Sequence, residues 1–330
     1  MNRYLRLGAF VLGATMLTVI IVHSHPAVLW RTLRSSLWVV GPLVALWGVV
    51  YACNARAWQL LIPRRPPRFT FWRAYLLSIS SFAMNYATPV FSLGGEPLKV
   101  SGATPILGRH RAVGSVVGFR FLHAISHIIV FLSAIIPAAI LLPHTLPMFA
   151  ALGFLTLFFA GAAAFLLSQH RQGIFERGVA LLARLGPLRR LAARLERHRG
   201  VLLELDNELT AIHAVPGHFK WALATEVSGR LICTLEYTII FYALGLGLDL
   251  PRAFVVANVS SAITNFLFFL PFEMGSKEGG AFVVFAWLGL DPKLGTTAAL
   301  LSRVRELAWM AIGITALLIA GDVKAPIQGQ

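Results

Sequence analysis

Two stretches decide the fold: Asn85-Tyr-Ala-Thr-Pro-Val-Phe-Ser-Leu-Gly-Gly-Glu-Pro97 and Asn265-Phe-Leu-Phe-Phe-Leu-Pro-Phe-Glu-Met-Gly-Ser-Lys-Glu-Gly-Gly280. In each, a proline follows an apolar segment and a glutamate follows that proline by seven residues, at Glu96 and Glu278. A Leu-Gly step comes next, and then an arginine enters a long apolar run 24 or 25 residues after the glutamate. These four ordered landmarks indicate an internal duplication. In membrane proteins, broken segments at corresponding positions of two halves indicate a transport site.

The composition is that of a polytopic helical membrane protein. Of 330 residues, 57% are hydrophobic and 13% charged, the mean hydropathy is +0.72, and several runs reach the roughly 20 apolar residues that cross a bilayer. The net charge of +15 lies mainly in loops, where Lys and Arg set topology and attract anionic lipid headgroups. We therefore expect membrane lipids and no nucleic acid as partners. Cys53 and Cys233 lie in apolar runs, which argues against a disulfide framework or a zinc site.

The apolar runs predict six full spans in a single transmembrane domain, residues 1–330: about 7–22, 37–62, 121–142, 147–167, 221–244 and 301–320. A cleaved signal peptide is the alternative for the first run, although His23-Ser-His-Pro-Ala lacks a small-x-small cleavage site. The basic loop at 63–73 is expected in the cytoplasm and the joint at 143–147, without Lys or Arg, outside. Both termini are then cytoplasmic.

A long polar insertion occupies residues 169–217. Leucines at helical spacing and many arginines predict cytoplasmic amphipathic helices there. These helices would lie on the membrane surface or, as the open alternative, pack on the protein's own loops.

The charge pattern predicts that the two broken segments enter the membrane from opposite faces. Residues 74–108 begin and end beside basic loops, whereas 253–290 begin and end outside. Each segment would form a re-entrant helical hairpin, which a bilayer tolerates only when the hairpin is buried in protein or lines a wet cavity. The duplication is then an inverted repeat, with repeat one at about 37–142 and repeat two at about 219–320. Complete crossing by both members of each hairpin keeps the inversion, and crossing by one member removes it.

The two glutamates are the first candidates for a binding site. Carboxylates are costly inside a membrane, so Glu96 and Glu278 are expected to pair with Arg120 and Arg303. Such pairs could be purely structural, or the guanidinium groups could bind an anionic headgroup bidentately. In the second case the four side chains converge in one hydrated pocket. Residues of the turns complete the candidate set, because glycine permits tight turns and helix N-termini present free N–H groups to phosphate: Gly94, Gly95, Gly275 and Lys277.

Further polar residues lie inside the predicted spans. Arg120, His123 and His127 share one helical face, which suits headgroup contact, a proton relay or plain interhelical hydrogen bonds, and no metal is expected. Glu226 and Arg230 have the spacing of an i,i+4 salt bridge. Glu236 has no obvious partner, and Arg305 and Glu306 extend the network around Arg303.

Catalysis is not expected. The four aspartates, at 206, 249, 291 and 322, lie outside clear spans. The chain has no Gly-x-Ser-x-Gly, His-Glu-x-x-His or Walker-type motif. The sequence therefore predicts no enzyme, no cofactor and no transport powered by nucleotide hydrolysis on this chain.

At these motifs the chain resembles the flippase-like transmembrane family named after lysylphosphatidylglycerol synthase. The resemblance covers most of the chain and depends on Pro89–Glu96, Pro271–Gly280 and the Arg120 and Arg303 segments. It implies a lipid-translocase-like fold, stand-alone relatives associated with hopanoid lipids, and cavity roles for the glycines, glutamates and arginines of these motifs. The synthases also carry a large soluble aminoacyl-transfer domain, which is not expected here because the sequence ends ten residues after Ala320. Lys277 stands where we expect an Arg.

The predicted function is nucleotide-independent translocation of an anionic or isoprenoid-type lipid across a bacterial-type inner membrane. Two alternatives stay open. One is a secondary transporter of a small anionic solute. The other is a non-catalytic membrane partner in lipid or glycan assembly. The protein partners expected for the chain are a lipid-biosynthesis enzyme or further copies of itself, as a homo-oligomer.

Overall fold

The computed structural model describes residues 26–62, 64–87, 94–169, 217–267 and 275–321, with isolated positions that include Glu273. The predicted first span, nearly all of the insertion at 169–217, and the segments 88–93 and 268–272 lie outside the described residues. Within the described part the chain is helical and contains no strand. The helices are α2 (Pro26–Ser36), the 3-10 turn η1 (Leu37–Val39), α3 (Val40–Leu60), α4 (Phe71–Ala87), α5 (Gly95–Leu107), α6 (Arg109–Leu141), α7 (Leu146–Gln169), α11 (His218–Ala243), α12 (Leu250–Phe266), α13 (Ser276–Trp287) and α14 (Pro292–Gly321).

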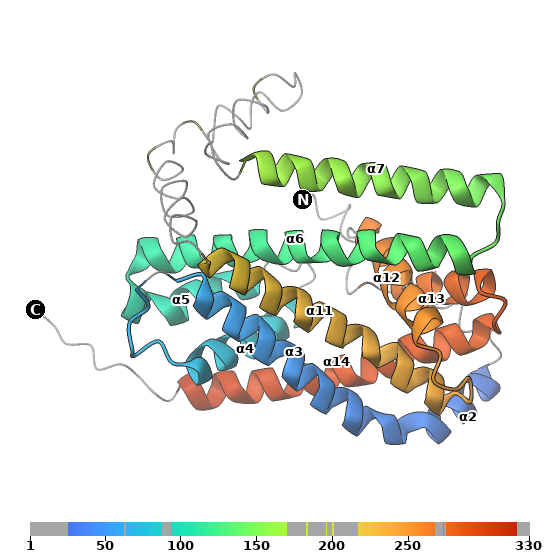
Figure 1. Ribbon diagram of the computed structural model, residues 1–330. Helices are drawn as coiled ribbons and strands as arrows, with labels where there is room; N and C mark the ends of the chain where they lie inside the picture. The colour runs from blue at the N-terminus through green and yellow to red at the C-terminus, as the bar shows by residue number, and fades with distance from the viewer. Residues whose placement is uncertain are drawn as a thin grey trace, which may run out of the picture.

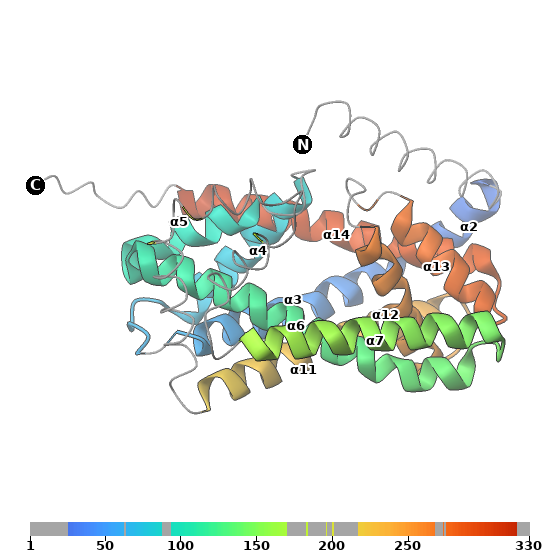
Figure 2. The same cartoon turned by 90° about the horizontal axis from the view of Figure 1, so that it is seen from above.

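Five long helices, α3, α6, α7, α11 and α14, extend along the bundle, and the two short pairs lie at its opposite ends (Figures 1 and 2). The pair α4/α5 lies where α6 begins, and the pair α12/α13 lies where α6 ends. Each end has its own apolar core. Leu61, Leu107 and Ala112 belong to the first core, and Leu142 and Leu288 belong to the second.

The two short pairs exchange partners across the bundle. The second helix of each pair packs on the long helix that follows it, α5 on α6 and α13 on α14. The first helix packs on the long helix of the other half, α4 on α14 and α12 on α6. The helices that precede the pairs, α3 and α11, pack on each other. Each half of the chain therefore makes the same kind of helix contact with the other half.

Glycines open the second helix of each pair. A Cβ on Gly95 would lie 2.2 Å from the carbonyl oxygen of Ser81, so only glycine lets α5 begin so close to α4. Gly275 has a φ of +78°, which glycine adopts at no steric cost, and α13 begins directly after it. In each broken segment the second helix thus begins at a position that needs glycine.

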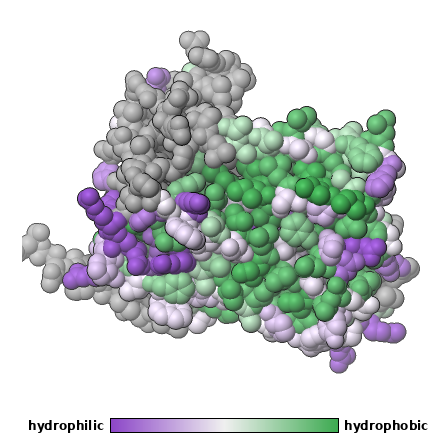
Figure 3. Space-filling view, in the orientation of Figure 1, coloured by the Kyte–Doolittle hydropathy of each residue, from purple (hydrophilic) through white to green (hydrophobic). Residues whose placement is uncertain are grey.

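Three described segments are long and apolar enough to cross a membrane: Trp30–Leu60, Arg109–Leu141 and Leu146–Ala164. The spans predicted at 221–244 and 301–320 fall on α11 and α14, which have sufficient length but carry ionisable residues. The count of six spans remains a prediction. Hydrophobic residues cover the middle of the visible face and hydrophilic ones gather toward its ends (Figure 3), as in a multi-pass membrane protein.

Candidate functional site

The first predicted ion pair joins α5 to α6. Arg120 Nε donates to Glu96 Oε1 at 2.6 Å, and Glu96 lies in the first turn of α5. The Arg120 side chain is 39% exposed and that of Glu96 is 16% exposed. This pair therefore remains open to molecules outside the bundle.

The second predicted ion pair joins α13 to α14 and is more deeply buried. Arg303 contacts both carboxylate oxygens of Glu278, with Nη2 at 3.1 Å from Oε2, and Glu278 is 0% exposed. The same Oε2 accepts the Gly275 N–H at 3.0 Å. Glu278 therefore fixes the start of its own helix as well as pairing with Arg303.

The expectation that the half-helix N-termini offer free N–H groups is wrong at both turn glycines. Gly95 N–H donates to Asn85 Oδ1 at 2.7 Å, and Gly275 N–H is bound by Glu278. Side chains from the same broken segments cap these groups, because a buried helix start needs acceptors for its N–H groups.

A third cluster surrounds Glu226, which is 0% exposed on α11. Its Oε1 lies 2.6 Å from His123 Nδ1, and Asn54 Nδ2 donates to its two oxygens at 2.8 and 2.9 Å. The predicted partner Arg230 is farther away, with Nε 4.0 Å from Glu226 Oε1, and its Nη2 contacts the His123 ring. The His127 ring centroid lies 5.0 Å from that of His123. His123 thus replaces Arg230 as the closest partner of Glu226.

A fourth cluster lies farther along α11. Arg305 Nη2 donates to Glu236 at 3.0 and 3.1 Å, and Trp47 Nε1 donates to the same carboxylate at 2.7 Å. Lys277 pairs with Glu306. The polar clusters use equivalent positions of the two halves. Arg120 and His123 on α6 have the same i,i+3 spacing as Arg303 and Glu306 on α14.

A polar cavity of about 160 Å³ lies among α3, α11, α12, α13 and α14. Of the ten predicted site residues, only Lys277 lines it. Glu96, Arg120, Glu278 and Arg303 do not line this cavity, and their convergence in one pocket stays a prediction. The helix α11 instead contributes the side chains that connect the clusters, Glu226, Arg230 and Glu236. The helices α6, α11 and α14 are far apart in the sequence. Residue spacing therefore could not predict which of their side chains contact one another.

Sequence reasoning also missed Lys99, three residues after Glu96. Lys99 is 6% exposed, and its ammonium lies 4.6 Å from the centroid of the Phe119 ring and 5.4 Å from that of Trp58. A cation over aromatic faces is stabilised by their quadrupoles. A lysine inside an apolar broken segment was the signal that could have identified it.

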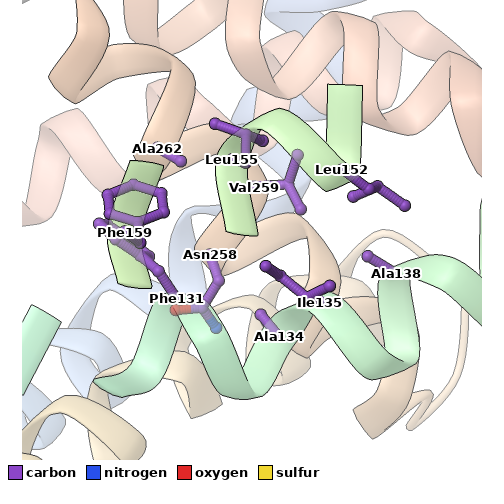
Figure 4. A pocket seen from close by; sticks show the side chains of 10 residues that line it. All are labelled: Phe131, Ala134, Ile135, Ala138, Leu152, Leu155, Phe159, Asn258, Val259 and Ala262. Atoms are coloured by element: carbon purple, nitrogen blue, oxygen red, sulfur yellow. The ribbon is translucent and has the colours of Figure 1, made fainter. Parts of the chain in front are cut away.

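A second, apolar crevice lies between α6, α7 and α12 (Figure 4). Its volume is only about 20 Å³, and its lining is hydrocarbon except for Asn258. Since Asn258 Nδ2 already donates to the Phe254 carbonyl at 2.9 Å, the crevice offers little to a charged group. The polar cavity is therefore the better candidate for a headgroup.

Comparison with known families settles the family of the chain. The model of the lysylphosphatidylglycerol synthase TM region matches residues 6–314. The chain belongs to this family. As a member it is a multi-pass membrane protein related to lipid modification or transport. No curated protein and no solved structure matched it.

Proposed function

We propose that the protein is a nucleotide-independent lipid translocase that moves a phosphate-bearing lipid, of anionic or isoprenoid type, across a bacterial-type inner membrane without a catalytic step. One observation carries the proposal: ionisable side chains from α11, α13 and α14 line a headgroup-sized cavity inside an apolar helical bundle. An ionisable residue at the bilayer centre costs about 2.5–3.5 kcal/mol on insertion scales, and such residues mark substrate pathways.

The polar clusters extend along the bundle in the direction that a headgroup must travel. Glu226 and Glu236 are ten residues apart on α11, which corresponds to about 15 Å of helix. Arg230 lies between them, and the half-exposed Arg120 contacts Glu96 on α5. Phosphate would pass from one guanidinium group to the next while the acyl or isoprenoid tails remain in the surrounding lipid.

The proposal includes an inverted repeat with re-entrant pairs. The reciprocal packing of α4 on α14 and α12 on α6 supports it, as does the position of the pairs at opposite ends (Figure 1). The end of the bundle where α4 begins and α5 ends would face the cytoplasm. Over residues 61–73 and 108–111 it has no acidic residue and several arginines: Arg64, Arg65, Arg68, Arg73, Arg109 and Arg111.

Reconstituted liposomes test translocation. Vesicles containing the purified protein and a phosphatidylglycerol with a fluorescent acyl chain are treated with impermeant dithionite, without nucleotide. We expect the wild-type protein to expose inner-leaflet label to bleaching. Arg120→Ala should slow this exposure by about tenfold or more, the equivalent of about 1.4 kcal/mol, because a half-exposed cation on the headgroup path is lost.

The matched control is Asp249→Asn, which breaks the exposed pair of 2.9 Å between the N-cap residue Asp249 and Arg252 in the first turn of α12 and should leave the rate unchanged. Equal rates for wild type, Arg120→Ala and protein-free vesicles would refute translocation. Uptake of a small anionic solute without lipid exposure would favour a secondary transporter. Lipid exposure only with a co-purifying enzyme would favour a role as an assembly partner.

A further inference from the structure

The polar cavity has the size of a headgroup. Its volume of about 160 Å³ is close to that of a cavity that holds one benzene molecule, about 150 Å³. A small polar group fits in such a space, and two acyl chains do not. The side chains that line the cavity therefore indicate which headgroup chemistry it accepts.

The charges of the lining are balanced. Three cations, Arg230, Lys277 and Arg305, face the cavity together with three carboxylates, Glu236, Glu273 and Glu306. Two of these carboxylates are already paired, because Arg305 binds Glu236 and Lys277 binds Glu306. A ligand that carries only negative charge would be repelled by the carboxylates of the lining, and this repulsion opposes its binding.

Three residues of the cavity lining each have a buried hydrogen-bond donor with no acceptor among the described residues, and these donors expose less than 1 Å² to solvent: Arg230 Nε, Arg305 Nη1 and Ser302 Oγ. Arg305 is 2% exposed and Ser302 is 1% exposed. The Arg305 guanidinium carbon lies 3.8 Å from the centroid of the Trp47 ring, so its plane is held in place. Leaving a buried donor unpaired costs about 1–3 kcal/mol, more for a charged group. The guanidinium groups of Arg230 and Arg305, which line the cavity, supply the positive charge that an anionic group needs.

Glu273 supplies the complementary charge. Its backbone is held in the left-handed region with φ +53°, and its carbonyl accepts Arg303 Nη2 at 2.9 Å and Ser276 Oγ at 3.0 Å. Its carboxylate forms no ion pair within the part of the chain that the structure describes, and the residue lines the cavity. The backbone is thus anchored while the carboxylate remains available to a cation.

We propose that this cavity binds a zwitterion that carries a phosphate and an ammonium group, with Arg230, Arg305 and Ser302 toward the phosphate and Glu273 toward the ammonium. As a statement about lipids, this rests on the proposed translocase function. A zwitterionic phospholipid headgroup and a free phosphoryl amine share this chemistry. The proposal refines the anionic headgroup expected from the sequence by adding a cationic end.

The first experiment measures binding and does not depend on transport. Thermal unfolding of the detergent-solubilised protein is followed with glycerophosphoethanolamine, with dihexanoyl phosphatidylethanolamine and with glycerophosphoglycerol, which lacks the amine. We expect the amine compounds to raise the melting temperature of the wild-type protein, and the Glu273→Gln variant to lose this difference. Equal effects of all compounds on both proteins would overturn the zwitterion site. Protection by the tail-free amine alone would identify a free solute as the ligand.

The second experiment measures transport with acyl-labelled phosphatidylethanolamine and phosphatidylglycerol. We expect faster exposure of the amine lipid, a loss of this preference of about tenfold in Glu273→Gln, and slower exposure of both lipids in Ser302→Ala. Equal rates for both lipids in wild type and Glu273→Gln would overturn the lipid assignment while leaving translocation intact. Binding without exposure of either lipid would instead contradict the proposed translocase function.

Discussion

At the scale of single residues, buried carboxylates with several donors hold the helices together. Glu226 is fully buried and receives Asn54 from α3 at 2.8 and 2.9 Å. Asn54→Ala would leave both oxygens short of a donor, at a cost of about 1–3 kcal/mol. We expect the melting temperature in detergent to fall by several degrees. Ser228→Ala is the control on the same helix, since Ser228 Oγ is exposed and bonds only to its own helix at Ala224. Equal melting temperatures for both variants would contradict this role of Asn54.

The sequence was sufficient to predict some of these residue contacts. The nearly equal spacing of the two halves predicted the partners of Glu96 and Glu278, because each pair lies within one repeat. It could not predict that His123, from another long helix, lies 2.6 Å from Glu226. Contacts between α6 and α11 depend on how the two helices pack, and a local sequence pattern does not predict which of their residues are close.

At the scale of elements, the α3–α11 contact depends on a small residue. A Cβ on Gly229 would lie 2.9 Å from Cys53 Cβ, whereas one on Gly153 in α7 would meet nothing within 4 Å. Gly229→Ala should therefore destabilise the protein by about 1–3 kcal/mol through overpacking. Gly153→Ala should be neutral or slightly stabilising, because alanine favours helix. Thermal unfolding of both variants measures the difference, and a stabilising Gly229→Ala would refute the close contact.

The helix pairs themselves could be predicted at this scale. Proline and glycine punctuation placed broken segments at 74–108 and 253–290, and the structure has α4/α5 and α12/α13 there. The exchange of partners could not be foreseen, since α4 and α14 are far apart in the sequence. Nor could the cavity, which needs side chains from five helices.

At the scale of the whole molecule, the distribution of charge predicts an orientation. Arginines without acidic neighbours gather in the loops where α4 begins and α5 ends, including Arg68 and Arg109. At the other end the loops contain Asp249 beside Arg252, as well as the exposed Leu248 and Asp291. Positive loops are retained in the cytoplasm. The two ends of the first pair should thus lie inside, and those of the second pair outside.

Single cysteines test this inversion in a Cys53→Ala, Cys233→Ala background. Leu248→Cys and Asp291→Cys, before and after the second pair, should react with an impermeant maleimide in intact cells. Arg68→Cys and Arg109→Cys, at the first pair, should react only after permeabilisation. The reason is geometric: a pair that returns to its own face, or crosses twice, leaves both of its ends on one side. If the two ends of either pair react from opposite sides, one member alone crosses the membrane. The two halves would then share one orientation, and the reciprocal packing of α4 on α14 and α12 on α6 would not reflect an inverted repeat.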